Sequence, residues 1–131
     1  MKIKRILFIG ITSVLCVLLA GMVHTEPGQP VDGQPYRSVT ASDVVQMMEQ
    51  QEVYLLDVRE AQEAESGMLP NAVNYPLSYF SRQIEQADLP TDAYIVVYCS
   101  SGVRSTKAAR KLCNMGYQHV FDLGAMPDWP S

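Results

Sequence analysis

The feature that most constrains the fold is the apolar run AYIVVY at residues 93–98, which is followed directly by CSSGVRS and a helical pattern. A short run of β-branched and aromatic residues without polar alternation is typical of a strand buried on both faces. Such strands occur in parallel sheets that helices cover on both sides. We therefore expect residues 93–98 to form the central strand and residues 105–115 to form a helix after a loop.

Other short apolar runs alternate with helical patterns along the chain. We expect helices over residues 43–51, 61–65 and 78–87 and further strands over residues 53–56, 72–74 and 119–121. Ser42 is the expected N-cap of the first of these helices. Alternating strands and helices predict an α/β domain with a central, mainly parallel sheet of about five short strands flanked by helices.

The first 25 residues have a different character. A basic start, MKIKR, precedes an almost unbroken apolar stretch over residues 6–23, which is the order found in secretory signal peptides. Leu18 stands where a cleavage site would have a small residue, and the stretch approaches the length that spans a bilayer. Removal as a signal peptide and retention as a membrane anchor are both open, and we favour removal. Both alternatives predict a protein that is exported to a bacterial periplasm. Retention of the segment would also tether the protein to the inner membrane.

Residues 26–36 are rich in Pro, Gly and Gln and lack apolar periodicity, so we expect a linker there and a folded domain over residues 37–131. All 14 acidic residues lie after residue 25, together with seven of the ten basic residues, which leaves a formal charge of −7 on the exported part. This balance excludes nucleic acid as a partner, because phosphate binding needs a basic face.

Two cysteines, Cys99 and Cys113, lie in the expected domain, whereas Cys16 is part of the apolar stretch. An exported pair of cysteines usually forms a disulfide. Here Cys113 lies about two helical turns beyond the loop, which separates the two Cα atoms by more than about 10 Å, whereas a disulfide needs about 7 Å or less. We predict two unpaired cysteines, with Cys99 reactive and Cys113 buried.

Residues 99–104 lie at the carboxyl end of the expected central strand, which is where parallel sheets bind ligands. A loop of small residues can direct successive backbone N–H groups inward, and Gly102 permits the backbone conformation that this needs. The following helix N-terminus and the Arg104 cation add positive charge. These features predict a Cys99 thiolate at neutral pH.

Four motifs in order resemble the rhodanese-domain sulfurtransferase family. YCSSGVRS at residues 98–105 is similar to its active-site loop, and LLDVRE at residues 55–60 to its first-strand motif. SGMLPNAVNYPL at residues 66–77 resembles the family's Gly-His-Ile-Pro-Gly-Ala-x-Asn-x-Pro segment, and GYQHVFDLGAMPDW at residues 116–129 resembles its closing segment. The resemblance covers residues 37–129 and implies a rhodanese-like three-layer fold.

Three positions depart from the family pattern. Met68 stands where the family usually has His, and Asn71 and Ala125 stand where it usually has Gly. We expect none of the three to touch the loop that carries Cys99.

The resemblance implies that Cys99 attacks the outer sulfur of a small anionic donor such as thiosulfate and becomes a persulfide, which passes to a thiol or to cyanide. It also implies that the persulfide lies in a loop made of Ser100, Ser101, Gly102, Val103, Arg104 and Ser105. Asp57, Arg59 and Lys107 are candidates for supporting roles. We expect a monomer with no cofactor and no metal, which contacts a membrane only through an uncleaved N-terminal segment.

Two further functions stay open beside thiosulfate sulfurtransferase: a rhodanese module that binds a partner without turnover, and a carrier that delivers sulfur to one exported protein. The cysteine-dependent phosphatases, as a family, space Cys and Arg by five residues, whereas Cys99 and Arg104 are separated by four. The shorter loop surrounds a volume nearer to that of one sulfur atom, which argues against phosphatase chemistry.

Overall fold

A computed structural model describes residues 27–30 and 33–130 of the chain. The expected signal or anchor segment, residues 1–25, lies outside the described residues, as does Cys16. Within the described part, no helix has both the length and the apolar character needed to cross a bilayer.

Six strands form one sheet, in the order β1 (Gln29–Pro30), β2 (Arg37–Ser38), β6 (His119–Ala125), β5 (Tyr94–Cys99), β3 (Val53–Asp57) and β4 (Val73–Asn74). β1 is antiparallel to β2, and the other five strands are parallel. The strand β5 lies between β6 and β3, so the most apolar run is central, as predicted. Its position fixes where the following loop emerges.

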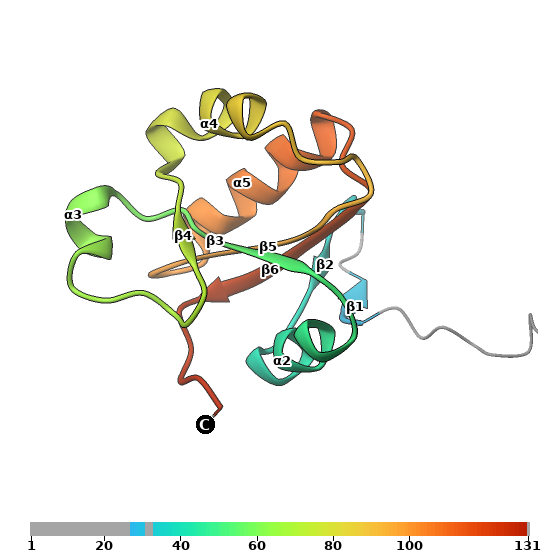
Figure 1. The fold of residues 1–131 in the computed structure, drawn as a ribbon, viewed down its shortest axis with the longest axis horizontal. Coiled ribbons are helices and arrows are strands. Elements are labelled where there is room, and N and C mark those ends of the chain that lie inside the picture. Colours follow the sequence, from blue (N-terminus) through green and yellow to red (C-terminus); the bar gives the residue numbers. More distant parts are fainter. Residues whose placement is uncertain (1–26, 31–32, 131) are drawn as a thin grey trace, which may run out of the picture.

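Helices cover both faces of the sheet. They are α2 (Ala41–Gln50), α3 (Ala61–Ala64), α4 (Phe80–Ala87) and α5 (Val103–Asn114), and a short 3-10 helix, η1 (Leu77–Tyr79), precedes α4. Figure 1 shows α2 on one face of the sheet and α4 and α5 on the other. This arrangement confirms the expected α/β class with helices flanking a parallel sheet.

Successive residues of β5 contribute to different cores because side chains alternate across a strand. Ile95, Val97 and Cys99 pack on the face covered by α4 and α5, whereas Val96 and Tyr98 pack on the face covered by α2. All five residues are 0 % exposed. A strand buried on both faces explains the continuous apolar run in the sequence.

Two helices begin earlier than predicted. Thr40, not Ser42, is the N-cap of α2: its hydroxyl accepts from the Asp43 backbone N–H at 3.2 Å, and the Asp43 carboxylate accepts from the Thr40 N–H at 2.8 Å. The helix α5 begins at Val103, with Gly102 as its N-cap. The end of the predicted active-site loop therefore forms the first turn of this helix.

The segment that we expected to be a linker, residues 26–36, is folded in part. Its residues 29–30 form β1, and Tyr36 is buried in the core beneath α5 at 6 % exposure. Two contacts hold this segment to α5: Arg110 Nε donates to Gln34 Oε1 at 3.0 Å, and the Cys113 thiol lies 3.6 Å from the Pro35 carbonyl oxygen. Packing against the domain thus begins before Arg37.

Candidate active site

Cys99 is the last residue of β5, and the neighbouring strand holds its backbone. Its Cα pairs with that of Ala125 in β6, and its carbonyl oxygen accepts from the Met126 N–H at 2.7 Å. The residue is 0 % exposed, although the adjacent Ser100 is exposed. The thiol therefore lies just below the surface at the carboxyl edge of the sheet.

Backbone N–H groups face the sulfur of Cys99. The Gly102 N–H donates to Sγ at 3.0 Å, and the N–H groups of Ser101 and Ser105 also hydrogen-bond to it. Burial raises the pKa of the thiol, but these hydrogen bonds together outweigh burial and place the pKa below its usual value. The pKa is shifted in the direction expected from the sequence, and the thiolate at neutral pH stays a prediction.

The Ser105 hydroxyl is a further group that can donate to the sulfur. It lies 3.0 Å from the Gly102 carbonyl oxygen and also within hydrogen-bond reach of Cys99. A hydroxyl has one proton, so it can donate to only one of these acceptors at a time. A charged thiolate is the stronger acceptor, so ionisation of Cys99 draws this proton to the sulfur.

Gly102 has φ +88°, in the left-handed region. A Cβ atom built there would lie 3.7 Å from the backbone of Ala125 and Gly124, which is ordinary contact. The position therefore needs glycine for its backbone conformation and not for space. This conformation turns the loop into α5 and directs the Gly102 N–H at the thiol.

Arg104, which we expected to add positive charge beside the loop, is paired with a carboxylate. Its guanidinium forms two hydrogen bonds with the Glu63 carboxylate, at 2.5 and 2.8 Å, and a third with the Ser100 hydroxyl at 2.8 Å. The hydrogen bonds from Arg104 lower the pKa of Glu63 to about 2. Through Arg104, Glu63 therefore joins α3 to the first turn of α5 and to the loop.

Asp57 and Arg59 form a second ion pair at the same edge. Arg59 Nη2 lies 2.6 Å from Asp57 Oδ2, Arg59 Nε lies 3.0 Å from both carboxylate oxygens, and the Arg59 backbone N–H donates to Oδ1 at 2.9 Å. The guanidinium also donates to the Gly67 carbonyl oxygen at 2.7 Å. This pair therefore braces the segment between α3 and β4.

Tyr98 connects this ion pair to the same segment. Its hydroxyl donates to Asp57 Oδ2 at 2.9 Å and accepts from the Leu69 backbone N–H at 3.0 Å. Burial raises the pKa of Tyr98 to about 12, so the hydroxyl keeps its proton at neutral pH. Tyr98, the residue before Cys99, thus holds the backbone at Leu69, two residues before Asn71.

The three residues that depart from the family pattern, Met68, Asn71 and Ala125, lie in different structural environments. The expectation that none touches the Cys99 loop is wrong for Ala125, which pairs with Cys99 in the sheet after a register shift between Val97 and Tyr98. Asn71 has φ +63°, a conformation that Asn tolerates better than most residues, which explains how it replaces glycine. Met68 is 40 % exposed.

The remaining candidates lie at the surface or away from the loop. Ser101, Val103 and Lys107 are exposed, and the role of Lys107 stays a prediction. Cys99 and Cys113 are both free thiols, as expected, but Cys113 is half-buried and not buried as predicted, and its partial burial raises its pKa. Among the described residues, no group of three or more His, Cys, Asp or Glu side chains is placed to hold a metal ion.

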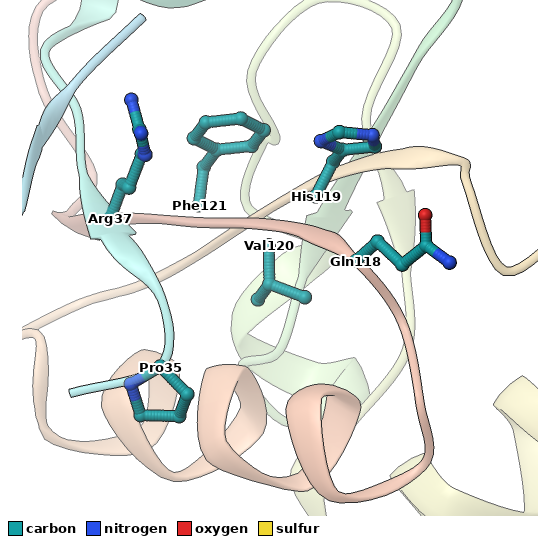
Figure 2. A pocket seen from close by; sticks show the side chains of 6 residues that line it. All are labelled: Pro35, Arg37, Gln118, His119, Val120 and Phe121. Carbon is teal, nitrogen blue, oxygen red and sulfur yellow. The ribbon is translucent and has the colours of Figure 1, made fainter. Parts of the chain in front are cut away.

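A pocket at the opposite edge of the sheet is distinct from this site (Figure 2). It is lined by Pro35, Arg37, Gln118, His119, Val120 and Phe121, at the beginning of β6. His119 pairs with Tyr94 at the start of β5, whereas Cys99 ends that strand five residues later, about 16 Å away along its axis. A ligand in this pocket therefore could not contact the thiol.

Sequence reasoning missed Glu63 and undervalued Tyr98. Glu63 lies in the segment EAQEAE, in which nothing distinguishes it from its acidic neighbours, and its partner Arg104 is 41 residues away. Tyr98 carried one signal, since it is one of two phenols in a mostly apolar buried strand and a buried hydroxyl usually has a hydrogen-bond partner. The signal does not identify that partner.

The chain is similar to known sulfurtransferases. It is 35 % identical to a sulfurtransferase of Allochromatium vinosum over 60 % of this chain and 73 % of that protein. It is 30 % identical to the thiosulfate sulfurtransferase GlpE of Shewanella oneidensis over 72 % of this chain and 92 % of that protein.

Solved structures that are similar to this chain are also rhodanese-related proteins. A rhodanese-related protein of Thermoplasma volcanium matches with a TM-score of 0.60 and 31 % identity over 72 % of this chain and 90 % of its own. A rhodanese-like domain protein of Staphylococcus aureus matches with a TM-score of 0.61 and 26 % identity over 72 % and 91 %. Residues 40–131 match the family described as Rhodanese-like domain, and the chain belongs to that family.

Proposed function

We propose that this protein is a sulfurtransferase that moves a sulfane sulfur from a donor such as thiosulfate to a thiophilic acceptor, a thiol or cyanide, through a persulfide on Cys99. The observation that carries the proposal is the set of N–H groups around the thiol, which lowers its pKa despite full burial. A thiolate is the form of cysteine that attacks sulfur.

The first half of the reaction forms one S–S bond and breaks another. The Cys99 thiolate attacks the outer sulfur of thiosulfate, and sulfite leaves with the electron pair of the broken bond. In the second half, the acceptor takes the outer sulfur and Cys99 returns to the thiolate. Such a division into two half-reactions produces ping-pong kinetics.

Each group around the sulfur has a task in this scheme. The N–H groups of Ser101, Gly102 and Ser105 stabilise negative charge on the thiolate and then on the persulfide. Arg104 holds the loop through Ser100. Because Cys99 is fully covered, the loop or its neighbours must move slightly before a donor reaches the sulfur.

The test is to incubate the protein with thiosulfate and measure its intact mass and the sulfite released, with Cys99→Ser as the control. We expect the wild type to gain one sulfur atom, to release one sulfite for each sulfur gained, and to lose that sulfur to cyanide. Cys99→Ser should gain none. An unchanged wild-type mass would refute the proposal, and a persulfide that cyanide discharges but small thiols do not would point to one dedicated acceptor protein.

We further propose that the protein is exported to a bacterial periplasm. The basic start and the apolar stretch of residues 6–23 support this proposal. Cell fractionation with an antibody tests it, and the mass of the mature chain distinguishes removal of the segment from anchoring. Recovery of the full-length chain with the cytoplasmic fraction would contradict it.

A further inference from the structure

Glu63 lies at the carboxyl edge of the sheet, where it is paired with Arg104 beside the loop that carries Cys99. The two guanidinium groups at the carboxyl edge of the sheet, those of Arg59 and Arg104, are each bonded to a carboxylate. A third carboxylate, Glu60, hydrogen-bonds to Ser78 and contributes to the field at Arg104. A donor that approaches Cys99 therefore meets cations whose charge is already balanced.

We propose that Glu63 is a specificity-determining residue, which neutralises Arg104 and thereby weakens the binding of doubly charged donors relative to singly charged ones. This inference rests on the proposed function. Its physical basis is that the interaction of a donor with an unbalanced Arg104 charge grows in proportion to the charge of the donor.

The geometry supports an effect of the charge without loss of the loop. The Glu63 side chain is 39 % exposed and the Arg104 side chain 25 % exposed, so an approaching anion can reach the pair from solvent. Arg104 Nη2 also donates to the Ser100 hydroxyl at 2.8 Å, a second contact with the loop in which the Glu63 carboxylate takes no part. A glutamine at position 63 keeps one oxygen that can accept from Arg104 and removes the charge.

Two donors that differ in charge but react in the same way can test this inference. Thiosulfate carries two negative charges, and methanethiosulfonate, in which a methyl group replaces one oxygen, carries one. The Cys99 thiolate attacks the outer sulfur of either, and sulfite or methanesulfinate leaves with the electron pair of the broken S–S bond. Both reactions give the same persulfide, so the comparison isolates the charge of the donor.

The experiment measures kcat/KM for each donor with saturating cyanide in the wild type and in Glu63→Gln. We expect a rise of about fivefold for thiosulfate and about twofold for methanethiosulfonate, as partly exposed charge pairs predict. Added salt should lower the thiosulfate value of Glu63→Gln more steeply than that of the wild type, because it screens the unbalanced charge of Arg104.

Glu65→Gln is the matched control, since Glu65 is exposed, lies two residues away and carries the same charge. It should leave the ratio of the two kcat/KM values unchanged. Equal changes for both donors in Glu63→Gln, no change, or the same change in Glu65→Gln would overturn the inference. A wild type that takes sulfur from neither donor would overturn the proposed function as well, and intact mass distinguishes that result.

Discussion

The two ion pairs at the carboxyl edge of the sheet have the same chemistry and different surroundings. The side chains of Asp57 and Arg59 are 0 % and 9 % exposed, whereas those of Glu63 and Arg104 are 39 % and 25 % exposed. Asp57 also accepts from the buried Tyr98 hydroxyl. Asp57 is therefore closed off from solvent among its protein partners, whereas both members of the other pair are open to solvent.

This difference in burial predicts different roles for the two ion pairs, one in the stability of the fold and the other in donor binding. A buried ion pair whose partner is removed leaves a charge that water cannot reach, which is costly. A partly exposed pair can lose one partner to water or to a ligand at little cost. We therefore expect substitutions at Asp57 to act on stability and substitutions at Glu63 to act on donor binding.

The largest expected effect comes from Asp57→Asn. It leaves the Arg59 guanidinium without its counter-charge, and we expect the free energy of unfolding to fall by about 3 kcal/mol. Urea denaturation followed by circular dichroism measures the loss. The double variant Asp57→Asn/Arg59→Met should recover part of it, because the unpaired charge is gone. A loss no larger than that of Glu63→Gln would show that burial does not distinguish the two pairs.

A smaller loss is expected for Tyr98→Phe. The ring remains, but the Leu69 backbone N–H loses its acceptor and Asp57 loses a donor. A buried donor without a partner costs about 1–3 kcal/mol. Urea denaturation measures the cost, and hydrogen exchange at the Leu69 amide should become faster. Tyr79→Phe, at a side chain that is 63 % exposed, serves as the control. Unchanged exchange at Leu69 would show that the phenol does not hold this segment.

The elements near the buried pair could be predicted because their signals are local. Apolar runs without alternation indicate buried parallel strands, and β3 and β5 were placed within one residue at each end. The start of α5 was placed two residues late because a glycine in the left-handed conformation serves as its N-cap, and a sequence pattern does not show the backbone conformation of Gly102.

The contacts of the Cys99 loop with distant segments could not be predicted. Arg104 meets Glu63 only because α3, a helix of four residues, is brought against α5 by the whole fold. Ala125 lies opposite Cys99 because of a register shift, which depends on strand pairing. Tyr36 packs in the core although no apolar periodicity surrounds it. Local patterns placed Cys99 and the following loop at the end of the central strand, but they did not identify the groups that surround them.

The smallest expected effect is the pH dependence of the stability difference between the wild type and Glu63→Gln. The hydrogen bonds from Arg104 lower the pKa of Glu63 to about 2 from a usual value near 4.5. A carboxyl whose pKa is lower in the folded state stabilises the fold above its unfolded pKa and loses that contribution as pH falls toward the folded pKa. The difference in urea midpoints should therefore be constant above about pH 4.5 and decline toward pH 2.

Because both side chains are partly exposed, the difference should be small and should shrink with added salt. A difference that is independent of pH would mean that Glu63 supports the fold through packing rather than charge, and the contrast between the two ion pairs would then be one of position alone.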